Sequence, residues 1–348
     1  MTSLVIRSAQ DAIAAVPYLL GFHPSRSLVV IGFEGRSRGT CAIRLDLPAP
    51  GPAGRFATDR VATDRVATDR VAADRAAADR VAAVLAGNGF GRSLLLGYGP
   101  DEEVRQAAGP LRAALTSAGV PVAEAIRVAE GRWWSLTCVD VCCPPEGTPY
   151  DISATTVAAQ ATFAGHVALA DRAELVSSVQ PLDGPARAAM ARATERAEKR
   201  YLAHPSTPAE DDLAFVLALL ARARTGTRPT DDEVAWLGLL LTDLRLRDET
   251  WARLDEDAPA TDIAFWRDIV RRVDPAYAPA PASLLAFTAY SAGDGGLANV
   301  ALQRALDTDP AYSMAVILRE VVNAGIPPSR LRMHTPPGPP SAHRRKAC

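Results

Sequence analysis

The first 150 residues alternate between short apolar runs and helical patterns, which is typical of a mixed α/β domain. Residues 27–33 and 94–98 are nearly continuous apolar runs, so we expect strands that are covered on both faces. Residues 40–47 alternate in polarity after a short polar turn, as expected for an antiparallel partner of 27–33. The remaining elements expected in this half are helices over 8–20 and 101–118 and strands over 3–7, 120–128 and 132–138.

A five-residue repeat interrupts this pattern between residues 56 and 80, where Val-Ala-Thr-Asp-Arg and close variants follow one another. The alanine content favours a helix, which we expect over 55–82. Five residues advance about 140° around a helix beyond one full turn, so the valines wind around it and form no apolar stripe. We interpret the repeat as an exposed helix that tolerates shortening by whole units. A docking rod for a partner is the alternative.

From residue 151 onward the strand-like alternation disappears and helical periodicity takes over. The expected helices cover 155–170, 185–202, 208–225, 230–244, 260–273 and 281–292. The fold class predicted is therefore an α/β mixed-sheet N-terminal domain over residues 1–150, followed by an all-α helical C-terminal domain over 151–333. A proline-rich tail over 334–348 is expected to be disordered.

Residues 278–311 fit one tetratricopeptide-like helical hairpin. Small residues at Ala286, Ala298 and Ala305 would let two helices pack closely, and Pro310 would follow the end of the second. One unit cannot form a solenoid, because about three are needed for stability. We interpret it as a hairpin that completes the helical core, with a peptide-binding groove as the alternative.

Charge and hydropathy narrow the class of protein. The 38 basic and 40 acidic residues leave a net charge of -2, which argues against a nucleic-acid partner. No uninterrupted apolar stretch approaches 18 residues, so we expect no membrane span. The N-terminal residues lack the pattern of a signal peptide, and five cysteines do not resemble a secreted disulfide scaffold. These features predict a cytoplasmic protein.

Three cysteines gather before a Pro-Pro corner. Cys138, Cys142 and Cys143 could bind zinc if His23 supplied a fourth ligand. Neighbouring cysteines do not easily turn toward one metal, however, so we expect them to pack as small apolar side chains and expect no cofactor. A redox switch that uses the same thiols is a further alternative.

Catalysis by a thiol needs a base and a field that lowers the pKa of the sulfur. The candidates are His23, Cys142 and Glu146, because ligand sites collect at the edges of α/β sheets and between domains. No sequence motif joins the three, so the sequence leaves open whether the chain is an enzyme.

Three stretches together resemble an uncharacterised actinobacterial family, the domain of unknown function numbered 4192. They are Ala-Val-Pro-Tyr-Leu-Leu-Gly-Phe-His-Pro at 15–24 with the strand after it, Cys-Cys-Pro-Pro-Glu-Gly-Thr-Pro at 142–149, and Gly-Asp-Gly-Gly at 293–296 leading to Asp309-Pro310. The resemblance spans nearly the whole chain, supports the two-domain plan, and brings no established activity. The repeat at 56–80 is not part of it.

The sequence thus favours a cytoplasmic accessory or scaffold protein that binds another protein through its helical domain. The first alternative is an enzyme with a site at the domain junction, near His23 and residues 142–146. The second is a metal- or redox-responsive regulator that uses the cysteines.

Overall fold

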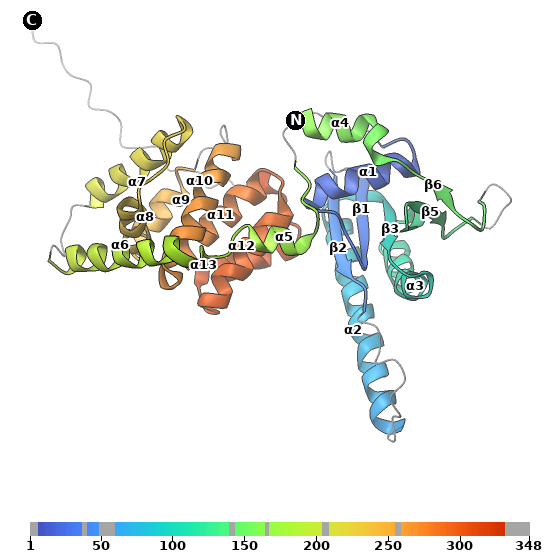
Figure 1. The fold of residues 1–348 in the computed structure, drawn as a ribbon. Helices are drawn as coiled ribbons and strands as arrows, with labels where there is room; N and C mark the ends of the chain where they lie inside the picture. Colours follow the sequence, from blue (N-terminus) through green and yellow to red (C-terminus); the bar gives the residue numbers. More distant parts are fainter. Residues whose placement is uncertain are drawn as a thin grey trace, which may run out of the picture. The chain divides into compact units, whose positions relative to one another are not determined.

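The computed structural model describes residues 6–36, 40–48, 60–138, 143–163, 167–203, 209–254 and 259–330 (Figure 1). The chain divides into two compact units, Met1–Val176 and Ser177–Cys348. Within the described ranges, the first unit contains a mixed six-stranded sheet and the second consists of helices, which confirms the predicted architecture. The first unit includes the segment 151–176, beyond the boundary expected near residue 150. The predicted tail lies outside the described residues.

The sheet has the strand order β2-β1-β3-β4-β5-β6. β3 and β4 are parallel and every other neighbouring pair is antiparallel. The two apolar runs of the sequence form strands inside this sheet, as predicted, and the structure pairs them as neighbours. The strands are β1 (Ser27–Gly35), β2 (Cys41–Asp46), β3 (Phe90–Tyr98), β4 (Val122–Ala129), β5 (Arg132–Ser135) and β6 (Thr148–Pro149).

The prediction of a strand over residues 3–7 is wrong for the two of these residues that the structure describes. Residues 1–5 lie outside the described part, and residues 6 and 7 are in no strand. The N–H of Arg7 instead donates to the Asp11 carboxylate at 3.0 Å, and Ser8 caps the helix α1 (Ala9–Leu20) by accepting from the Asp11 N–H at 3.1 Å. This segment therefore leads directly into a helix.

Helices cover both faces of the sheet (Figure 1). α2 (Arg60–Gly87) and α3 (Asp101–Ser117) pack on one face, where Leu28, Val30 and Leu95 are buried against Leu85 and Leu111. α1 lies over the opposite face. The alternation of side chains along each strand explains why the central strands are apolar throughout.

The segment after β6 returns to α1. α4 (Thr156–Phe163) packs Val157 against Ala14 and Ala15, and α5 (Arg172–Ser177) follows. Between them the backbone pairs with the end of α1: the N–H of His23 donates to the carbonyl of Leu169 at 3.0 Å. The helix predicted over 155–170 is therefore too long. It ends at Phe163, and Leu169 forms a β-bridge with Phe22 instead.

The repeat forms the predicted helix within α2, although residues 55–59 lie outside the described residues. Residues 71–76 are exposed, and burial begins only at Ala78 and continues with Val81 and Leu85. The end of α2 that carries the repeat extends past the sheet (Figure 1). The repeat unit over residues 71–75 therefore makes little apolar contact with the sheet unit.

The second unit contains eight of the thirteen α-helices assigned to the described ranges. The helix expected over 230–244 ends at Leu240, and a new helix begins after Asp243, whose side chain accepts from the Arg245 N–H at 2.8 Å. The helices are α6 (Gly184–Ala203), α7 (Ala209–Arg224), α8 (Asp231–Leu240), α9 (Leu244–Trp251), α10 (Pro259–Arg272), α11 (Pro279–Ser291), α12 (Gly295–Thr308) and α13 (Ser313–Asn323). Among these segments, none combines the length and the apolar character needed to cross a bilayer.

α11 and α12 form the expected helical hairpin. Ala286, Ala298 and Ala305 are at most 1% exposed, so small residues do lie where the two helices are buried. Gly293 adopts φ +88° in the connecting turn, a conformation that glycine tolerates best. The likeness of this hairpin to a tetratricopeptide unit stays a prediction.

Candidate functional site

The cysteine corner is described only in part. Cys138 and Cys143 are half-buried, whereas Cys142 lies outside the described residues. Of the histidine, cysteine, aspartate and glutamate side chains that are described, no three gather as a metal site would require. Because the predicted zinc ligands include Cys142, the zinc hypothesis and the thiol-based alternatives stay predictions.

The turn after these cysteines packs on β5. The indole N–H of Trp134 donates to the Pro145 carbonyl at 3.0 Å, and a guanidinium N–H of Arg132 donates to the Gly147 carbonyl at 2.8 Å. Gly147 has φ +78°, and a Cβ there would lie 2.4 Å from the Trp134 ring. Glycine is therefore required by both conformation and space. Glu146 is exposed on this turn.

His23 lies on the loop between α1 and β1 and is exposed. Its backbone is held by the bridge to Leu169, but its imidazole has no hydrogen-bond or ion-pair partner in the described part of the chain, and the Glu146 carboxylate has none either. Gly21 ends α1 with φ +79°, so the end of that helix does not depend on the His23 side chain. The described residues thus bring no catalytic pair together here.

The carboxyl ends of β3 and β4 form the edge at which open α/β sheets bind ligands. The glycines there have structural explanations: a Cβ at Gly97 would lie 2.3 Å from a Val104 methyl, and Gly99 has φ +152°. The following helix begins with Asp101, Glu102 and Glu103, whose charges repel phosphate. This turn is therefore unsuited to a nucleotide phosphate.

A buried polar group beside α1 was not anticipated from the sequence. Ser27 is paired with Tyr98 across β1 and β3, and both are at least nine-tenths buried. Neither hydroxyl oxygen has a hydrogen-bond partner among the residues that the structure describes, and burial raises the pKa of Tyr98. The phenol therefore stays neutral and can donate. Polar residues at the two ends of otherwise apolar strands are the sequence signal that could have found them.

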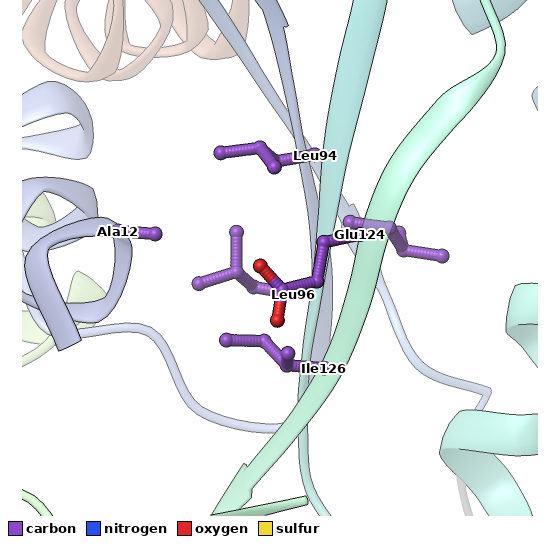
Figure 2. Close-up of a pocket in the computed structure, with 6 residues that line it drawn as sticks. Ala12, Leu94, Leu96, Glu124 and Ile126 are labelled. Carbon is purple, nitrogen blue, oxygen red and sulfur yellow. The ribbon is translucent and has the colours of Figure 1, made fainter. Parts of the chain in front are cut away.

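Further along this face the space under α1 is small. Figure 2 shows Leu94, Leu96, Ile126 and the Glu124 carboxylate on the side of the sheet that faces Ala12. The gap between them is about 10 Å³, which is about the space of one water molecule. It cannot hold an organic ligand.

A larger cleft, of about 410 Å³, lies within the helical unit. This volume falls in the range of binding sites for small molecules and peptide side chains. One wall is apolar and consists of Leu182, Ala186 and Met190; the other consists of Arg228, Pro229, Thr230, Asp231 and Arg272. The residues come from the start of the unit, from the connection between α7 and α8, and from the end of α10.

Ion pairs hold the polar wall in place. Arg272 is 5% exposed and donates to the Pro229 carbonyl at 2.8 Å, to Asp231 at 2.6 Å and to Asp268 at 2.9 Å. Arg228 forms a second pair with Asp268 at 2.6 Å. Burial alone would raise the pKa of Asp268, but the two arginines outweigh it and lower that pKa. The wall is therefore rigid and charged at neutral pH.

Comparison with known proteins adds a family and no activity. The model of one protein family, described as "Domain of unknown function (DUF4192)", matches residues 10–329. No curated protein and no solved structure matches the chain.

Proposed function

Because the chain belongs to the DUF4192 family, whose description names no activity, we propose a function from the geometry: an accessory protein that binds a segment of a partner protein in the cleft of its helical unit. The observation that carries the proposal is the cleft of about 410 Å³ with one apolar and one charged wall. A cytoplasmic location is part of the same proposal.

The two walls suit an amphipathic peptide segment. Apolar side chains of the partner would cover Ala186 and Met190, since burial of apolar surface drives most protein association. Arg228, whose side chain is 67% exposed, also lines the cleft and offers a charged rim. Polar rims of this kind set the register and specificity of a complex more than its affinity.

Ala186 permits a direct test, because it is exposed and lines the cleft. Ala186→Phe would obstruct the cleft with one ring, at an exposed position outside the core. The matched control is Ala188→Phe, an exposed position on the same helix that does not line the cleft. Each variant is first compared with the wild type by circular dichroism.

The measurement is quantitative cross-linking and pull-down from native lysate. We expect proteins captured by the wild type and by Ala188→Phe to be lost with Ala186→Phe. Identical captured proteins in all three samples would refute the cleft as the binding site.

A further inference from the structure

The polar wall of the cleft contains a chain of four side chains whose charges alternate. Arg228 donates from Nε and Nη2 to the two carboxylate oxygens of Asp268, at 3.2 and 2.6 Å. Asp268 also accepts from Arg272 at 2.9 Å, and Arg272 in turn donates to Asp231 at 2.6 Å. The order along the chain is therefore positive, negative, positive, negative, and the charges of the four groups cancel.

The two inner members of this chain are occupied by their neighbours. Both carboxylate oxygens of Asp268 accept from arginines. Arg272 is buried and, besides its two carboxylate partners, donates to the Pro229 carbonyl at 2.8 Å. These two residues therefore fix the positions of the outer members, Arg228 and Asp231.

The two outer members line the cleft and keep part of their hydrogen-bonding capacity. Asp268 occupies one edge of the Arg228 guanidinium, whereas the other edge, formed by Nη1 and the second N–H of Nη2, has no partner in the described part of the chain. Asp231 is 44% exposed and accepts through Oδ1, while its Oδ2 has no partner within the same ranges. One end of the wall thus offers donors and the other end an acceptor.

We propose that the cleft selects its partner segment by the order of the charges along that segment. An acidic side chain of the partner pairs with the free edge of Arg228, a basic side chain pairs with Asp231, and an apolar side chain covers Met190. The inference rests on the proposed function and adds the chemistry of the partner. A segment with the opposite order would place like charges together at both ends of the wall, so the wall also sets the direction in which the segment binds.

An acidic side chain fits this wall better than a chain-terminal carboxylate. Terminal carboxylates are captured by several backbone N–H groups. Next to Arg228, however, Pro229 has no N–H, and the N–H of Thr230 donates to the Glu233 carboxylate at 2.8 Å. The guanidinium edge of Arg228 is therefore the donor available to the acid.

The probe is a library of short random peptides displayed on phage. It is selected against the immobilised full chain and, separately, against Ala186→Phe. Sequences enriched only on the wild type are synthesised, and their dissociation constants are measured by fluorescence anisotropy. We expect these peptides to share an apolar residue together with an acidic and a basic residue in one fixed order.

The decisive comparison uses a charge-swapped peptide, in which the acidic and basic residues exchange places while composition and net charge stay the same. Two exposed ion pairs are lost and two repulsions of similar size replace them, so the swapped peptide should bind the wild type about tenfold more weakly. This comparison needs no variant of the protein.

Two variants locate the effect on the wall. Arg228→Gln removes the end that binds the acid, so the preference for the original peptide should fall to about threefold. The matched control is Arg196→Gln, because Arg196 pairs with Asp232 in an exposed position and does not line the cleft. This control should keep the full preference. The melting temperature of each variant is compared with that of the wild type first.

The outcomes separate this inference from the proposed function. Peptides that lose binding with Ala186→Phe but bind equally well after the charge swap would overturn the inference and leave the cleft as the binding site. A preference that persists in full with Arg228→Gln would also overturn it, since the charges would then be recognised elsewhere. A selection that yields no peptide sensitive to Ala186→Phe would overturn the inference and the proposed function together.

Discussion

The ion pair between Arg224 and Asp262 gives the sharpest test of the helical unit. Arg224 on α7 donates from Nε and Nη2 to the two carboxylate oxygens of Asp262 on α10, at 2.9 and 2.7 Å. The Asp262 side chain is 1% exposed and the Arg224 side chain 31%. Replacement of Arg224 by methionine would leave a buried carboxylate without its partner.

The structure sets the expected magnitude. Removal of one member of a buried pair costs about 3–5 kcal/mol, because the remaining charge stays desolvated. Asp262 lies in the first turn of α10, where the helix dipole compensates up to about 1 kcal/mol. We therefore expect Arg224→Met to lower the free energy of unfolding by about 2–4 kcal/mol, and the additional change Asp262→Asn to recover part of that loss.

The assay is urea unfolding of the full chain, followed by tryptophan fluorescence, which reports on the fully buried Trp266 of α10. The control is Arg196→Met, which breaks a pair with Asp232 of the same residue types whose side chains are 59% and 67% exposed. An exposed pair contributes about 0–1 kcal/mol. Equal losses for Arg224→Met and Arg196→Met would refute the argument that burial makes the first pair costly to break.

Four further predictions concern single positions or segments. Gly238→Ala places a Cβ 2.4 Å from a buried valine methyl, so thermal unfolding should show a net loss of about 1–2 kcal/mol, whereas Gly87→Ala meets nothing within 4 Å and should be neutral or slightly stabilising. Because the pKa of Asp268 is lowered in the folded state, its ion pairs stabilise the fold above about pH 4, and this stabilisation is lost as the pH falls through the folded-state pKa. Asp268→Asn should therefore be less stable than the wild type at pH 7 and should lose less stability on acidification. Parallel profiles of unfolding free energy against pH for the two proteins would contradict this. Burial raises the pKa of Cys41 to about 11, so its alkylation by iodoacetamide at pH 8 should be at least 100-fold slower in the folded than in the denatured chain, as read by peptide mass spectrometry. Deletion of residues 61–75 should leave the melting temperature of the sheet unit unchanged. If the deletion unfolded the sheet unit, the repeat would have a structural role.

Much of the local structure could be read from the sequence because its causes are local. Ser8 and Gly21 mark the two ends of α1, and the apolar run of β1 predicts its burial on both faces. The capping box of Thr230 and Glu233 similarly marks the start of α8. Each signal acts between residues at most a few positions apart, so composition and spacing are sufficient to locate it.

The candidate sites were less predictable. His23 and Glu146 are individually visible as chemistry-bearing residues, yet among the described residues neither side chain has a partner. The hydroxyls of Ser27 and Tyr98, which have no partner within the described ranges, lie opposite each other only because of the register of β1 against β3. Strand register depends on pairing over long sequence distances and carries little local signal.

By itself, the sequence determined the class of each half: a sheet with covering helices, then helices alone. Only the tertiary structure decided that residues near Leu169 return to the end of α1 and that Ala186 and Arg272 line one cleft. The physical reason is that periodicity specifies which face of an element is buried, whereas the choice of the surface that covers it depends on the packing of the whole unit.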